Sequence, residues 1–358
     1  MSVKKRVLQI AVFLVIMFLT FYALFSGRDL SEIGRALQRM SPWYLIPSVG
    51  LAVFFVCAEG FMIWYLLRSM KSQKEGRRAS SLIRCIQYSF IGFFYSGITP
   101  SATGGQPVQL YYMNKDGNRG SDSTVVLMTV AVAYKFILVL IGVGILLFWY
   151  APLHAELGRY FPLYLLGLLL NVVLVVLILG VMLFPKVILH LALLFEGLFI
   201  RMRIWKPSDK REEKINAFID SYQQAVTWLR GHRRSLVIVL LVTFLQRCSV
   251  FVLTYMVYLG FGLQGAGAMR VILLQAAVYI AVDMLPLPGA QGITELMYQA
   301  VFVHVFTGAY LIPSMMVSRG INFYFLLVVS LGVVLVNRFI FDRRSERIKK
   351  NVTKCWEK

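Results

Sequence analysis

The sequence predicts an all-α polytopic membrane protein, a helix bundle of six full spans plus two re-entrant broken-helix hairpins. Hydrophobic residues make up 58% of its 358 residues, and the mean hydropathy is +0.70. A soluble domain is only roughly half apolar, so the bilayer is the expected solvent. We therefore expect a single integral membrane domain over residues 1–358.

The charged residues are few and mostly basic. Lys and Arg number 37 against 17 Asp and Glu, a formal net charge of +20. Such an excess suits nucleic acid or anionic lipid, and the apolar bulk decides for lipid, because membrane proteins gather Lys and Arg on cytoplasmic loops. We expect a multi-pass protein of a bacterial inner membrane, with both termini cytoplasmic, membrane phospholipids as partners and no direct contact with nucleic acid.

Cysteine and histidine spacing predicts no cofactor and no metal site. The cysteines are Cys57, Cys85, Cys248 and Cys355. They lie singly, without CxxC spacing or paired histidines, so the sequence suggests neither a disulfide framework nor a zinc site. The sequence also lacks a Walker loop, a nucleophile elbow and an HExxH motif, so no catalytic residue is predicted and a hydrolase or an ATP-driven pump is unsupported.

Six uninterrupted apolar stretches are long enough to cross a hydrocarbon layer of roughly 30 Å at about 1.5 Å per residue. They are Val7–Phe25, Trp43–Leu67, Val125–Trp149, Leu163–Phe184, Leu236–Leu259 and Ile321–Phe341. The first follows a basic start, as a signal peptide does. It is too long for one and has no small-residue cleavage pattern, so we expect it to be retained as a span.

Two further apolar regions are interrupted near their middles. Leu82–Met113 breaks at Thr99–Pro107, and Val271–Phe306 breaks at Pro286–Gly292. Each arm alone is short for a crossing, so each region is predicted to be a re-entrant hairpin. The alternative is that each region makes a single full crossing. That layout would place Lys115 and Arg119 outside, where basic residues are less common, so the charge distribution favours hairpins through these two residues alone.

The order span, hairpin, span occurs twice with opposite orientations. The first hairpin would enter from the cytoplasm and the second from outside, which is the arrangement of an inverted-topology repeat. Two unrelated kinks in a bundle are the alternative, because the halves show no strong sequence similarity. In this layout the arginines on the outside are Arg28, Arg35, Arg39, Arg159, Arg270 and Arg319.

The largest polar segment, residues 185–235, mixes apolar and basic residues at helical spacing. It is predicted to form amphipathic helices along the cytoplasmic face. Apolar positions that recur on one side include Ile219, Tyr222, Val226 and Leu229. A segment of about fifty residues is too short for a catalytic domain of usual size.

The first interruption, with the motif GGQPVQLYYM, predicts a site for an anionic group. Gly104 and Gly105 permit a sharp turn, and Pro107 suits the first turn of a new helix. Free amides at this helix start, with nearby hydroxyls, would hold an anion such as a lipid phosphate. The alternative for the tip is a turn that only caps the hairpin. The alternative for Tyr111 is an anchor at the membrane interface. The candidate substrate-binding residues are Ser101, Thr103, Gly104, Gly105, Gln106 and Tyr111.

The second interruption, with the motif PLPGAQGITE, lies between Asp283 and Glu295. Ionised groups in apolar surroundings cost several kcal/mol unless they are paired, so a cation or a proton is the expected partner. Lys135 and Arg247 are the predicted protein partners, and charges that only hold the bundle together are the alternative. The same two possibilities stay open for Glu59 in the second span. The candidate residues here are Lys135, Arg247, Asp283, Gly289, Gln291 and Glu295.

At these two motifs the sequence resembles the lysylphosphatidylglycerol synthase transmembrane region, a flippase-like family. The motifs are GGQPVQLYYM at Gly104–Met113 and PLPGAQGITE at Pro286–Glu295, in this order and each in a broken apolar segment. In the multiple peptide resistance factors of this type, a membrane part moves aminoacylated phosphatidylglycerol between leaflets and a cytosolic domain transfers lysine from lysyl-tRNA. The chain ends soon after its last predicted span, so we expect it to lack that synthase domain.

The resemblance implies a lipid translocator for an anionic or aminoacylated phospholipid such as lysyl-phosphatidylglycerol, which contributes to envelope charge and resistance to cationic antimicrobial peptides. One alternative is a phosphatidylglycerol lysyltransferase, or the membrane half of one with a separate synthase as partner. A further alternative is that the protein translocates a polyprenyl-phosphate carrier or serves as a scaffold for a lipid glycosyltransferase. The sequence leaves open whether the protein forms a homodimer. Family members often carry an acid at Gln106, an Arg at Gln109 and a Glu-Arg pair at Tyr134 and Lys135, so the headgroup is not fixed by the resemblance.

Overall fold

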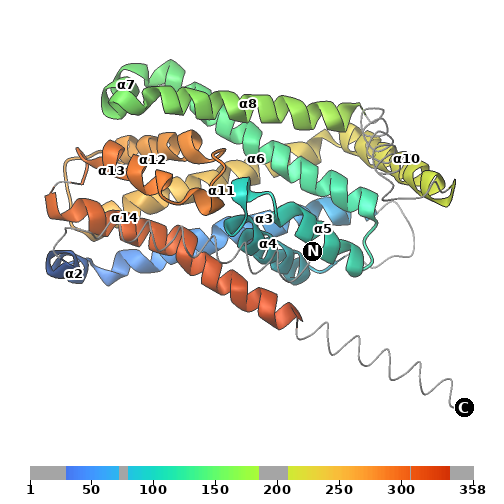
Figure 1. Cartoon of the computed structure of the whole chain (residues 1–358), viewed down its shortest axis with the longest axis horizontal. Helices are drawn as coiled ribbons and strands as arrows, with labels where there is room; N and C mark the ends of the chain where they lie inside the picture. Colours follow the sequence, from blue (N-terminus) through green and yellow to red (C-terminus); the bar gives the residue numbers. More distant parts are fainter. Residues whose placement is uncertain (1–29, 72–79, 185–208, 307, 339–358) are drawn as a thin grey trace, which may run out of the picture.

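The computed structural model describes residues 30–71, 80–184, 209–306 and 308–338, and every regular element in these ranges is helical (Figure 1). This confirms the all-α polytopic bundle. Five described helical stretches are long and apolar enough to cross a membrane: Pro42–Met70, Gly120–Phe148, Tyr150–Met182, Arg233–Gly260 and Gly308–Arg338. They correspond to the second through sixth predicted spans, and the first, Val7–Phe25, lies outside the described residues.

Four long helices form the body of the bundle: α3 (Leu45–Lys71), α6 (Gly120–Phe148), α8 (Phe161–Leu183) and α11 (Arg233–Gly260). Their apolar residues are spread around the helix rather than on one stripe, as expected when lipid covers one side and protein the other. α3 packs along α11, and α6 contacts α3, α8 and α11. Two short helices, α2 (Leu30–Gln38) and α7 (Tyr150–Leu157), lie at the same end of the bundle but on opposite sides of it (Figure 1).

The last span begins earlier than predicted. The sequence predicts Ile321–Phe341, whereas the structure has a continuous helical path over Gly308–Arg338. This path consists of α14 (Leu311–Arg319), a π-helical stretch at Gly320–Phe325 and a helix that continues to residue 338. Arg319 therefore lies inside the span, and its predicted place in an outer loop is wrong. The polar residues before position 321 hid this part of the helix from a count of apolar residues.

The first interrupted region forms a helical hairpin. α4 (Leu82–Gly97) and α5 (Gly105–Lys115) pack side by side, and a 3-10 turn at Pro100–Ala102 makes the tip. At the base, Arg84 Nε lies 2.6 Å from Asp116 Oδ2. The two ends of the region therefore lie at the same end of the bundle, as the predicted re-entrant hairpin requires.

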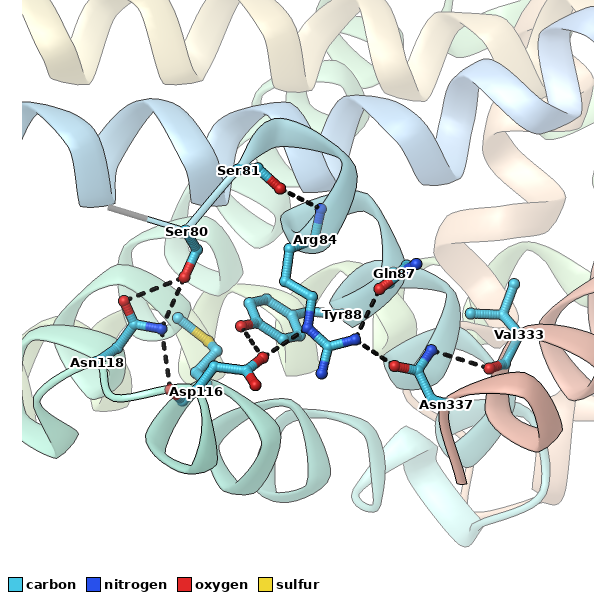
Figure 2. A network of polar contacts seen from close by, with 10 residues as sticks. Ser80, Ser81, Arg84, Gln87, Tyr88, Asp116, Asn118, Val333 and Asn337 are labelled. Carbon is cyan, nitrogen blue, oxygen red and sulfur yellow. Dashed lines mark hydrogen bonds and ion pairs between the residues drawn. The ribbon is translucent and has the colours of Figure 1, made fainter. Parts of the chain in front are cut away.

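A polar network fastens the base of this hairpin to the last span (Figure 2). The Asp116 carboxylate accepts hydrogen bonds from Arg84 and from the Tyr88 hydroxyl. Arg84 Nη1 also donates to Gln87 Oε1 at 2.7 Å and to the side-chain oxygen of Asn337. One guanidinium thus joins both arms of the hairpin to the end of the Gly308–Arg338 span.

The second interrupted region forms a matching hairpin from the opposite end of the bundle (Figure 1). α12 (Ala268–Val282) contacts α13 (Ile293–Phe302), with a 3-10 turn at Pro288–Ala290 between them. The two hairpin tips contact each other in the interior. Hairpins that enter from opposite ends and meet at their tips have the predicted inverted arrangement.

The two tips also share a sequence pattern and a backbone conformation. Pro100–Gly104 and Pro288–Gly292 both have the pattern P-x-A-x-G. In both, the proline opens a 3-10 turn after an extended residue, and the alanine has a positive φ, 55° at Ala102 and 49° at Ala290. Positive φ is uncommon for residues with a Cβ atom. Its recurrence at equivalent positions supports a true repeat over two unrelated kinks.

The polar segment is described from residue 209 onward. α10 (Asp209–Gly231) packs along α6, and its residues Ile219, Tyr222, Val226 and Leu229 are buried. The apolar side of α10 therefore covers the end of the bundle instead of facing lipid. The remainder of the predicted amphipathic segment, residues 185–208, lies outside the described residues.

Close packing between α3 and α4 depends on Gly60, where an added Cβ would lie 2.5 Å from the Ile86 Cα. We expect Gly60→Ala to lower the free energy of unfolding by about 1–3 kcal/mol, because the two backbones must move apart. Thermal unfolding in detergent measures this loss. Gly50→Ala in the same helix is the control, since nothing lies within 4 Å of its new Cβ. An equal loss in both variants would contradict this packing.

Candidate functional site

A cavity of about 490 Å³ lies where the hairpin tips meet the long helices. Aromatic and aliphatic side chains make up much of its wall. The charged residues that line it are Glu59, Lys135, Arg247, Asp283 and Arg319. Neutral polar side chains in the wall include Thr103, Gln106, Gln109, Gln246, Gln275 and Asn322. Apolar walls with a few convergent polar groups are typical of a ligand-binding site.

One ion pair connects α6 to the second hairpin. Lys135 Nζ donates to Asp283 Oδ2, and the Tyr134 hydroxyl donates to the other carboxylate oxygen. The Lys135 and Asp283 side chains are 10% and 11% exposed. Lys135 is therefore the one of the two predicted partners that pairs with Asp283, the residue directly after α12.

A second ion pair connects the second tip to the last span. Arg319 Nε lies 2.9 Å from Glu295 Oε1, and Arg319 also donates to the Gly289 carbonyl at 3.1 Å. Glu295 Oε2 accepts from the backbone N–H of Gly292 at 2.7 Å, so the carboxylate also caps α13. The partner of Glu295 is thus Arg319 and not Arg247. Sequence reasoning missed it because it placed Arg319 outside the membrane.

Arg247 is buried between aromatic rings. It is 5% exposed, and its guanidinium carbon lies 3.9 Å from the ring centroid of Tyr134 and 4.5 Å from that of Phe55. Nη1 donates to the Tyr279 hydroxyl at 3.4 Å. Within the described ranges no carboxylate forms an ion pair with Arg247, and its Nε has no hydrogen-bond partner. Cation–π contacts of this kind fix the orientation of a guanidinium without neutralising it.

Glu59 faces the same cavity from α3. Its Oε1 accepts a hydrogen bond from Gln109 Nε2 at 2.7 Å. No Lys or Arg among the residues that the structure describes forms an ion pair with it. The sequence left the role of Glu59 open and gave Gln109 none. The two come together because α4 packs against both α3 and α5.

The glycines of the first tip serve the turn more than an open anion site. The N–H of Gly104 donates to Thr99 Oγ1 at 2.9 Å. Gly105 is buried, and a Cβ there would lie 2.1 Å from Ser96 Oγ. These glycines therefore let α5 approach α4 closely. Ser101 was also predicted to bind the anion, and its side chain is not among those that the structure describes.

The other predicted residues divide into two groups. Thr103 and Gln106, both exposed, and Gly289 line the cavity. Tyr111 is not among the lining residues and is 59% exposed, which suits the alternative of an interfacial anchor. Gln291 is buried in the second tip, also away from the cavity lining.

The charges around the cavity balance in number. The acids are Glu59, Asp283 and Glu295, and the bases are Lys135, Arg247 and Arg319. Within the described part of the chain, no group of three or more His, Cys, Asp or Glu side chains could hold a metal ion. The arrangement can therefore bind charged groups of a ligand through carboxylate and guanidinium contacts.

Comparison with known proteins gives two matches. A family described as "Lysylphosphatidylglycerol synthase TM region" matches residues 6–330. A relative described as "UPF0104 membrane protein PH1989", from Pyrococcus horikoshii, is 28% identical over 298 residues, which cover 80% of this chain and 86% of the relative. The family match includes both hairpins and every cavity residue named above.

The Lys135–Asp283 pair yields a direct test of the charge arrangement. We expect Lys135→Met to lower the free energy of unfolding by about 3–5 kcal/mol, because it leaves a buried carboxylate without its partner. The double variant Lys135→Met/Asp283→Asn removes both charges and should recover most of that loss. Thermal unfolding in detergent compares the two. A double variant no more stable than the single variant would contradict the mutual neutralisation of Lys135 and Asp283.

Proposed function

Because the chain belongs to the lysylphosphatidylglycerol synthase transmembrane-region family, we propose that this multi-pass membrane protein translocates a phospholipid whose headgroup passes through the central cavity. The proposed substrate is an anionic or aminoacylated phospholipid, such as lysyl-phosphatidylglycerol. The proposed location is a bacterial cell membrane, with both termini in the cytoplasm.

The observation that carries this proposal is the polar cavity at the contact between the hairpin tips. Non-helical backbone at membrane depth is tolerated where it is buried in protein or lines a cavity. In many transporters, broken helices from two inverted repeats form the substrate site near the membrane midplane. Here Ala102 and Thr103 of one tip and Gly289 and Ala290 of the other line the same cavity.

The cavity suits a lipid headgroup for an energetic reason. A charged group at the centre of a bilayer costs several kcal/mol when it has lost its water and found no partner. The wall offers amide, hydroxyl, carboxylate and guanidinium groups as replacements for water. These contacts lower the barrier to moving a headgroup between leaflets.

The orientation follows from the basic residues. Lys115 ends α5, Arg119 precedes α6, Arg230 lies in the last turn of α10, and α11 begins with Arg233 and Arg234. These helix ends belong to the end of the bundle that carries α10 and the base of the first hairpin (Figure 1). Basic loops are retained on the cytoplasmic side, so this end is the proposed inner face. Delivery of an aminoacylated lipid to the outer leaflet would make that surface less negative and weaken the binding of cationic peptides.

The test is translocation in proteoliposomes. Labelled lysyl-phosphatidylglycerol and phosphatidylglycerol are followed by their loss of protection from a membrane-impermeant quencher. We expect the protein to speed exposure of at least one lipid, and Ala131→Trp, which fills the cavity from α6, to slow it about tenfold or more, because the headgroup loses its polar path.

Val143→Trp is the matched control, since Val143 lies on the same helix and is 40% exposed. It should translocate lipid as the unaltered protein does. Exposure no faster than in protein-free vesicles would contradict the proposal. Incorporation of lysine from lysyl-tRNA into phosphatidylglycerol, without translocation, would identify a transferase instead.

A further inference from the structure

The charges around the cavity differ in how they are satisfied. Two couples are closed by direct contact: Lys135 with Asp283, and Arg319 with Glu295. Arg247 and Glu59 remain, one of each sign, and neither forms an ion pair with any residue in the described ranges. Both line the cavity. The site therefore presents one positive and one negative group that its own side chains leave available.

The Arg247 guanidinium is built to bind an anion. The rings of Tyr134 and Phe55 hold it in place, and the hydroxyl of Tyr279, a neutral group, is its one acceptor among the described residues. Its Nε is buried and has no hydrogen-bond partner in the described part of the structure. A buried guanidinium N–H without a partner is uncommon, and a phosphate oxygen is a favourable acceptor for it.

Glu59 lies beside this guanidinium on the cavity wall. It follows Phe55 by four residues in α3, so the two side chains project from the same face of the helix. Its hydrogen-bond partner, Gln109, is neutral and so supplies no opposite charge. A primary ammonium group would neutralise this charge and donate up to three hydrogen bonds.

We infer that Arg247 and Glu59 together recognise a headgroup that carries both a phosphate and a primary ammonium, with phosphate at Arg247 and ammonium at Glu59. The inference rests on the proposed translocation of a phospholipid and names the residue that selects the headgroup. Phosphate is common to the phospholipids, so Arg247 serves all of them. Glu59 distinguishes lipids with an amine from lipids without one.

The test compares two acyl-chain-labelled lipids in proteoliposomes. Phosphatidylethanolamine carries phosphate and ammonium, whereas phosphatidylglycerol carries phosphate alone. We expect Glu59→Gln to lower the ratio of the phosphatidylethanolamine rate to the phosphatidylglycerol rate by about tenfold, the loss of one charged hydrogen bond. Arg247→Gln should slow both lipids and change the ratio by less than about twofold, because it removes a contact that both share.

Glu156→Gln is the matched control. This carboxylate pairs with Arg270 and is not among the residues that line the cavity. The ratio should therefore equal that of the unaltered protein. Translocation with an unchanged ratio in Glu59→Gln would overturn the role of Glu59 and leave the proposed function standing.

A protein that moves neither lipid would contradict the proposed function, and binding would then decide the inference. Native mass spectrometry measures the retention of phosphatidylethanolamine, phosphatidylglycerol and soluble phosphoethanolamine. A preference for the amine compounds that Glu59→Gln abolishes supports the inference, and equal retention of both lipids overturns it. Phosphoethanolamine bound as tightly as phosphatidylethanolamine would assign the two charges to a soluble phosphate ester and overturn a lipid ligand.

Discussion

A polar group without a partner is costly inside a hydrocarbon layer, and the structure of this protein depends on how its broken helices meet that constraint. Each hairpin tip interrupts a helix and frees backbone groups that lipid cannot hydrate. A side chain satisfies one of these groups in each tip, with Thr99 on the N–H of Gly104 and Glu295 on the N–H of Gly292. Two buried ion pairs then tie the second tip to neighbouring helices. These contacts help the tips from opposite ends to meet in the interior.

The same constraint separates cavity charges that form ion pairs from cavity charges that do not. Asp283 and Glu295 were candidate substrate-binding residues, yet each forms an ion pair with a basic side chain. Arg247 is held by aromatic rings and Glu59 by an amide, so their charges remain available in the cavity. Pairing within the protein therefore separates the cavity residues whose charges are closed by an ion pair from those that we propose as contacts for a headgroup.

Much of this fold follows from the sequence, because uninterrupted apolar length and Gly/Pro interruptions report directly on spans and hairpins. The inverted order of spans and hairpins follows as well, but the match between the two tips does not, since they share only P-x-A-x-G and their likeness lies in backbone angles. Arg319 was misplaced because polar residues, Ser314 and Ser318 among them, interrupt the apolar pattern before Ile321. The contact between Glu59 and Gln109 joins residues fifty positions apart. Such a contact depends on how α3, α4 and α5 pack, which no local sequence pattern predicts.

Photo-crosslinking with a phospholipid that carries a diazirine on its headgroup tests most directly whether headgroups enter the central cavity. We expect the labelled peptides to include α3 around Glu59, α11 around Arg247 and the two hairpin tips, and we expect unlabelled phospholipid to compete for them. Labelling confined to the outward faces of the spans, such as Leu169 and Val176 of α8, with none in the tips, would contradict passage of the headgroup through the cavity.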